Sequence, residues 1–146
     1  MIVVLQRVTH ASVIVDGKVM GKITRGILAL IGVERGDTES NADRMLERIL
    51  NYRIFVDSED RMNLSLKDIQ GGLLLVPQFT IAADTKKGMR PSFTPAAEPE
   101  IGKTLFHYFV ERAKAICSIV ETGRFGADMQ VELCNDGPAT FILKTN

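Results

Sequence analysis

The chain has no tryptophan, only two cysteines and no net charge. Its 18 basic residues balance its 18 acidic residues, whereas a long nucleic-acid footprint needs a basic face. A small contact with one end of an RNA remains compatible with this balance. Neutrality also removes charge repulsion between copies of the chain, so the composition is compatible with self-association.

The sequence also lacks long apolar runs, and we expect no leader. No apolar stretch approaches the roughly 18 residues that cross a bilayer. The apolar start of the chain follows no basic segment, and Arg7 interrupts it too early for a signal peptide. Cys117 and Cys134 match no metal-ligand spacing, and we interpret them as reduced, mostly buried thiols. We therefore expect a cytoplasmic protein that does not interact with membranes.

The first strands are visible as apolar runs and alternations. Ile2–Val8 and Ala11–Val15 are β-rich, and Asp16-Gly17 then predicts a tight hairpin turn into Lys18–Thr24, because both turn residues tolerate positive φ. Gly26–Val33 is apolar throughout, which is typical of a central strand that is covered on both faces.

The rest of the chain adds two helices and more strands. One helix begins near Asp37 or Thr38, and a second covers roughly Glu98–Ile116. The 146 residues, 45% of them hydrophobic, suit a single domain over residues 1–146. We predict an α+β fold with a strongly bent, barrel-like sheet and two packed helices. The core stripe of the second helix is expected at Ile101, Leu105, Tyr108, Phe109, Ala113 and Ile116, and further strands at Tyr52–Val56, Leu73–Pro77, Ala127–Cys134 and Ala139–Lys144.

Familiar catalytic and cofactor motifs are absent from the sequence. His10 lies between two expected strands and His107 lies in the second expected helix, so we interpret both as structural or solvent-facing. A catalytic triad is defined by geometry and stays open, but no nucleophile-elbow pattern supports one. There is no HExxH, no P-loop and no GxGxxG after a strand. We expect no metal and no cofactor.

Three short segments remain as candidates for chemistry. In Pro77-Gln78-Phe79-Thr80, backbone donors at a strand end could polarise a carbonyl, or the strand simply leaves the sheet. Asn135-Asp136-Gly137-Pro138 is either a plain turn or a rigid loop that presents carbonyls. The cations Lys86, Lys87 and Arg90 are either solvated or placed to neutralise phosphates.

These segments belong to a longer series of matching stretches. The stretches are Gln6-Arg7-Val8, Tyr52-Arg53-Ile54-Phe55, Met62-Asn63-Leu64, Gln78-Phe79-Thr80, Ala82-Ala83-Asp84-Thr85, Gly88-Met89-Arg90-Pro91-Ser92-Phe93, Thr122-Gly123-Arg124-Phe125, Ala127-Asp128-Met129-Gln130-Val131 and Asn135-Asp136-Gly137-Pro138. Through these stretches, which follow one another in the same order over essentially the whole chain, the sequence resembles bacterial D-aminoacyl-tRNA deacylases.

The resemblance implies a hydrolase that cleaves the carboxylic ester between a D-amino acid and the 3′ end of tRNA. It implies a homodimer with active sites at the interface, in which Gly137-Pro138 is a cis element that enters the other subunit's pocket. Two fixed carbonyls would then accept from the substrate ammonium and occupy the space of an L side chain. Such a filter admits many D-amino acids, and it also admits glycine, which has no side chain to clash.

The resemblance names Thr80 as a candidate nucleophile, but a hydroxyl without a base is a weak one. We favour activation of water by the 2′-OH of the terminal adenosine, with donors at Gln78, Phe79 and Thr80 positioning the ester.

The family motif usually begins with Ser where this chain has Pro77. Proline here is also found in a related branch with relaxed chirality, whereas Phe79 favours D-specificity. The alternatives are a non-catalytic module that binds the tRNA 3′ end and a structural dimer with ordinary turns.

Overall fold

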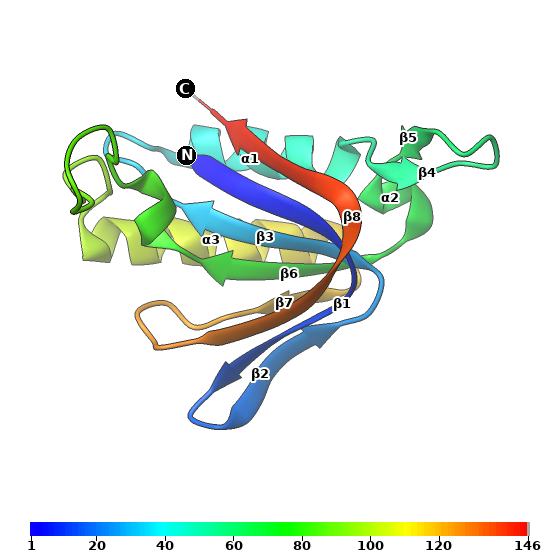
Figure 1. Cartoon of the computed structure of the whole chain (residues 1–146), viewed down its shortest axis with the longest axis horizontal. Helices are drawn as coiled ribbons and strands as arrows, with labels where there is room; N and C mark the ends of the chain where they lie inside the picture. The colour runs from blue at the N-terminus through cyan, green and yellow to red at the C-terminus, as the bar shows by residue number, and fades with distance from the viewer. Residues whose placement is uncertain (146) are drawn as a thin grey trace.

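A long first strand, β1 (Ile2–Val15), organises the sheet in this computed structural model, which describes residues 1–145. Its first half pairs with β3 (Gly26–Gly32) and its second half with β2 (Lys18–Ile23). The last strand, β8 (Gln130–Lys144), pairs with both halves of β1, so β2 and β3 share the opposite edge and must diverge. This divergence bends the sheet strongly (Figure 1).

The bent sheet is nearly closed into a barrel. Beyond β3 it continues through β6 (Gly72–Pro77) and β7 (Val120–Thr122), and both of these pairings are parallel. At the closing edge β2 meets β7 so closely that a Cβ on Gly21 would lie 2.9 Å from the Thr122 carbonyl oxygen. The predicted α+β fold with a bent, barrel-like sheet is confirmed.

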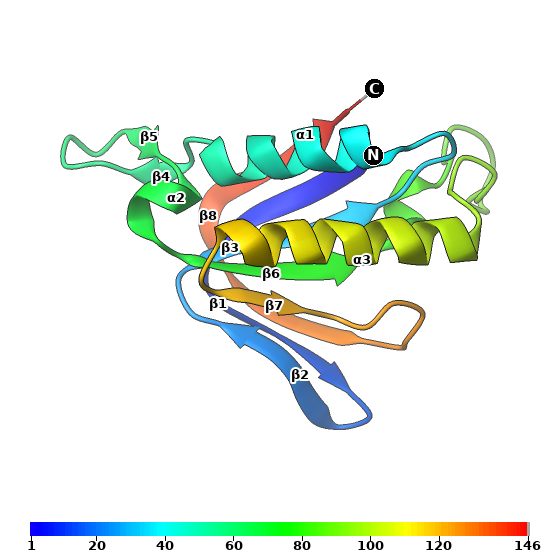
Figure 2. The ribbon, with the colours of Figure 1, turned by 180° about the vertical axis from the view of Figure 1, so that it is seen from behind.

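Helices cover one face of the sheet, and Figure 2 shows α1 (Glu39–Asn51) and α3 (Pro99–Ile116) running side by side across it. One core lies between these helices and the sheet, and a second fills the barrel interior. No helix among residues 1–145 is both long and apolar enough to cross a membrane. The shorter elements are β4 (Phe55–Val56), β5 (Met62–Leu64), α2 (Leu66–Ile69) and the 3-10 helix η1 (Phe79–Ala82).

The stripe predicted for α3 is partly wrong. Leu105, Phe109 and Ala113 are buried as expected, but Ile101 and Ile116 are 56% and 50% exposed. The buried face is instead rotated toward Gly102, Phe106 and Val110. These positions continue the i, i+3, i+4 pattern along the face that meets the sheet, whereas the two isoleucines lie at its margins.

The plain turn considered for Asn135–Pro138 is also wrong, because β8 continues through this segment. Gln6 pairs with Thr140 and Val8 pairs with Asn135, so two steps along β1 oppose five steps along β8. The extra residues form a bulge between paired stretches, which explains how turn-forming residues lie inside a long strand.

The burial pattern of α3 predicts that substitutions at two of its apolar positions differ strongly in their effect on the free energy of unfolding. Phe109→Ala removes a fully buried ring and should lower the free energy of unfolding by about 3–5 kcal/mol. Ile101→Ala on the exposed side should change it by no more than about 0.5 kcal/mol. Urea denaturation followed by circular dichroism measures both values. Equal losses in the two variants would contradict the observed orientation of α3.

Candidate functional site

The end of β6 leads directly into the first candidate segment. Pro77 is the last residue of β6, and the Gln78 N–H donates to the Ile31 carbonyl of β3 at 2.8 Å. The Gln78 N–H is one of the three backbone donors expected in this segment, and this hydrogen bond already occupies it. Phe79 and Thr80 open η1, and the first N–H groups of a helix have no acceptor within that helix. Their backbone therefore supplies the donors of this segment.

The Thr80 side chain has an amide as its partner. The Gln78 Nε2 donates to the Thr80 Oγ1. An amide does not remove a proton from a hydroxyl, and among the described residues no histidine or carboxylate is hydrogen-bonded to Thr80. The hydroxyl is thus oriented but not activated as a nucleophile.

An apolar cavity of about 240 Å³ lies beside η1. Phe79 lines the cavity and is 54% exposed, and its ring lies 5.2 Å from the Phe93 ring, centroid to centroid. The cavity is smaller than a typical drug-sized site and has aromatic walls, so it suits one planar ring. Its lining consists of Ile31, Val33, Pro77, Phe79, Ala97, Pro99, Gly102, Phe106, Phe125 and Gly126.

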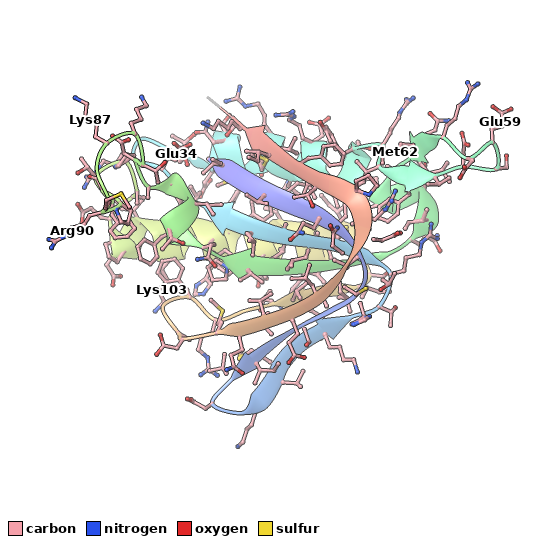
Figure 3. All side chains as sticks on the ribbon, viewed as in Figure 1. Glu34, Glu59, Met62, Lys87, Arg90 and Lys103 are labelled. Carbon is pink, nitrogen blue, oxygen red and sulfur yellow. The ribbon has the colours of Figure 1, made fainter. Side chains whose placement is uncertain are left out.

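The three loop cations lie at the same end of the molecule as η1. Lys86, Lys87 and Arg90 are exposed, and Figure 3 shows Lys87 and Arg90 pointing into solvent. The loop is closed at its base by two backbone hydrogen bonds between Asp84 and Ser92, of 2.8 and 3.0 Å. Within residues 1–145, no ion pair engages the three cations. They remain available to an anionic ligand.

The second candidate segment lies at the bulge of β8 and is hydrogen-bonded to neighbouring residues. The Gly137–Pro138 peptide bond is cis, as the resemblance implied. Arg7, with 6% exposure, donates from Nε to the Asp136 carbonyl at 3.0 Å and from Nη1 to the Ile54 carbonyl at 2.6 Å. The Asn135 amide donates to the Arg7 carbonyl at 2.9 Å. The segment is therefore a supported loop whose outer residues are exposed.

Within one chain the two candidate segments do not meet. On β3, Ile27 pairs with Arg7 beside the bulge, and Ile31 pairs with Pro77 before η1. These positions are four residues apart, which is roughly 13 Å along a strand. In Figure 1, the bend of β8 and the green helical turn that follows β6 lie at opposite ends of the sheet. The two segments of one chain are therefore well separated.

Titratable groups contribute little to this site. Hydrogen bonds from backbone N–H groups lower the pKa of Asp57 and Asp68, and burial raises the pKa of Tyr108, but none of these three residues lines the cavity. Burial raises the pKa of the Cys117 thiol, which favours the unreactive protonated form. The expectation of two mostly buried thiols is wrong for Cys134, which is exposed, and Cys117 is half-buried. Among the described residues, no three His, Cys, Asp or Glu side chains gather closely enough to hold a metal ion.

The sequence interpretation missed two parts of the site. Phe125 and Gly102 reach the cavity from segments far from Phe79 in the chain, and no local pattern connects them. Arg7 did leave a signal, because it continues the alternation of buried Val3 and Leu5. A charged residue at an inward position of a strand indicates a buried polar contact.

The chain is similar to known proteins over nearly its whole length. The model of the D-Tyr-tRNA(Tyr) deacylase family matches residues 4–144. A D-aminoacyl-tRNA deacylase of Methylococcus capsulatus is 62% identical over 99% of this chain and 94% of its own length. A protein of the same name from Thioalkalivibrio sulfidiphilus is 63% identical over 99% and 97%.

Two solved structures share the fold of this chain. One titled c-Myc DNA Unwinding Element Binding Protein superposes with a TM-score of 0.94 at 38% identity, over 100% of this chain and 99% of that one. A second, titled as a probable eukaryotic D-amino acid tRNA deacylase, has a TM-score of 0.78 at 20% identity over 97% of both chains, which shows the shared fold alone. The family match and the identities over nearly the full length show that the chain belongs to the D-Tyr-tRNA(Tyr) deacylase family.

Proposed function

We propose that this protein is a hydrolase that cleaves the ester between a D-amino acid and the 3′ end of tRNA. The observation that carries the proposal is the juxtaposition of the opening N–H groups of η1 with an aromatic cavity of about 240 Å³. The N–H groups of Phe79 and Thr80 are suited to bind the ester carbonyl as negative charge develops on its oxygen. The cavity suits the base of the terminal nucleotide.

The substrate supplies the reactive group in this proposal. Thr80 has no base beside it, since its hydroxyl is hydrogen-bonded to the Gln78 amide. The 2′-OH of the terminal ribose lies next to the ester in any aminoacyl-tRNA, so it can assist the attack of water. The protein then contributes positioning and hydrogen-bond donors, which lower the barrier without a nucleophilic side chain. Lys86, Lys87 and Arg90 are suited to contact phosphates near the 3′ end.

Chirality is proposed to be read by Gly137-Pro138 of a neighbouring subunit in a homodimer. Two features support this role: the loop is held in place through Arg7 and Asn135, and it lies far from its own η1. Ile142, on the same strand, is 65% exposed, which suits a surface that a second copy covers. Fixed carbonyls at this loop would exclude an L side chain and leave D side chains unread.

This filter predicts a definite order of substrates. D-Tyr-tRNA and glycyl-tRNA should be hydrolysed, whereas L-Tyr-tRNA should be hydrolysed at least about 100-fold more slowly, because a steric clash of a few kcal/mol separates the two enantiomers. Release of labelled amino acid from each tRNA measures the rates. Equal rates for the D and L esters would refute the filter.

If the terminal ribose assists the reaction, a change in the tRNA should reduce turnover far more than a change at Thr80. Thr80→Ala should keep turnover of D-Tyr-tRNA within about tenfold of the parent protein, since loss of a true nucleophile costs on the order of 10⁶-fold. Replacing the terminal 2′-OH by hydrogen, with the amino acid on the 3′ position, should abolish turnover. Single-turnover hydrolysis assays compare the two. Abolition by Thr80→Ala, with the deoxy substrate still cleaved, would establish Thr80 as the nucleophile instead.

A non-catalytic module that binds the tRNA 3′ end is the second candidate, favoured by the exposed cations near η1. The zero net charge counts against it, because binding without chemistry relies on a broad basic surface. Tight binding of uncharged tRNA, together with no ester cleavage of any aminoacyl-tRNA, would support this alternative.

A further inference from the structure

We propose that a groove along α3 binds the backbone phosphates of the RNA strand that leads to the 3′ end. This inference rests on the proposed function and adds a second contact surface to it. The groove has a volume of about 460 Å³ and lies between α3 and the segment that follows β7. Figure 2 shows α3 running alongside β7 and the loop beyond it.

The basic residues of α3 in this groove share one face of the helix. Lys103, His107 and Lys114 are spaced by four and seven residues, which places them within about 40° of one another around the helix axis. Arg124 faces them from the segment after β7, and all four side chains are exposed. Phe106 and Val110 form an apolar floor beneath.

The charges in the groove are unbalanced. Among the described lining residues, Glu111 is the one carboxylate beside Lys103, Lys114 and Arg124. None of these three cations takes part in an ion pair within residues 1–145. Elsewhere Arg35 and Arg112 are paired with carboxylates. The chain as a whole has no net charge, but this groove carries unpaired positive charge. Such a groove attracts a polyanion.

The groove opens next to the proposed ester site. Phe106 and Phe125 line both the groove and the cavity beside Phe79. In Figure 3, Lys103 lies at the same end of the molecule as Lys87 and Arg90. An RNA strand whose last base enters the cavity would therefore run over Lys103 first. From Lys103 to Lys114 the helix rises about 16 Å, which is long enough for more than one phosphate.

This continuity favours RNA over other acidic partners. An acidic peptide would satisfy the same cations, but nothing would connect it with the cavity. A nucleic-acid strand connects them, because its terminal nucleotide and its upstream phosphates belong to one chain. The groove would add affinity for the tRNA and leave the chemistry at η1 to the donors already described.

The test compares two substrates that differ in upstream phosphates. D-Tyr-tRNA carries them, whereas the D-tyrosyl ester of adenosine does not. In the double variant Lys103→Gln/Lys114→Gln, the ratio of kcat/KM for the tRNA to kcat/KM for the adenosine ester should fall about tenfold at low salt. The slope of log kcat/KM for the tRNA against log salt concentration should become less negative by about 1.4, since each of the two lost single-strand phosphate contacts contributes about 0.7.

A matched control removes the same charge elsewhere. Lys18→Gln/Lys67→Gln changes two exposed lysines on β2 and α2, outside the groove, and should leave both the ratio and the salt slope unchanged. An unchanged ratio in the groove variant, an equal fall in the control, or an equal loss on both substrates would overturn the inference. If the parent protein cleaves neither ester, the proposed function itself fails, which is a separate result.

Discussion

The pairing of β1 with β8 is the constraint on which the rest of the structure depends. The two strands run together for nearly their full lengths, and they lose register around Arg7 and Val8. This arrangement forces β2 and β3 to share the other edge of β1, which bends the sheet and creates a barrel interior distinct from the helix-side core. The same loss of register produces the bulge that carries Gly137-Pro138. The bend of the sheet and the bulge that carries Gly137-Pro138 thus both result from the pairing of β1 with β8.

The buried guanidinium of Arg7 explains how that bulge keeps its shape. An irregular segment leaves backbone carbonyls without strand partners, and buried or half-buried carbonyls need donors. Arg7 supplies donors to the carbonyls of Asp136 and Ile54, and it also lies 3.2 Å from the Asp136 carboxylate. The strand that bends the sheet therefore also supports the loop that is proposed to read chirality.

The chemistry proposed at η1 relies on backbone donors and on the substrate. Thr80 is positioned by the Gln78 amide, and no acidic or basic side chain lines the cavity among the described residues. A site of this kind suits an activated ester, because its leaving group departs without a strong acid catalyst. The 2′-OH of the terminal ribose supplies the hydroxyl that assists the attack of water. Accurate placement of the RNA end then becomes the protein's main task, and this is the role proposed for both the cavity and the α3 groove.

The sequence by itself determined the elements with strong local periodicity and the short segments worth attention. The hairpin at Asp16-Gly17, the apolar central strand, both long helices and the end of β6 follow from local patterns and turn chemistry. The resemblance to D-aminoacyl-tRNA deacylases, more than local sequence patterns, singled out Gln78-Phe79-Thr80 and Gly137-Pro138. Only the tertiary structure decided which face of α3 is buried, that Gly137-Pro138 lies in a bulge, and that Phe79 shares a cavity with Phe125. These features depend on contacts between residues far apart in the chain, whose geometry local propensities do not encode.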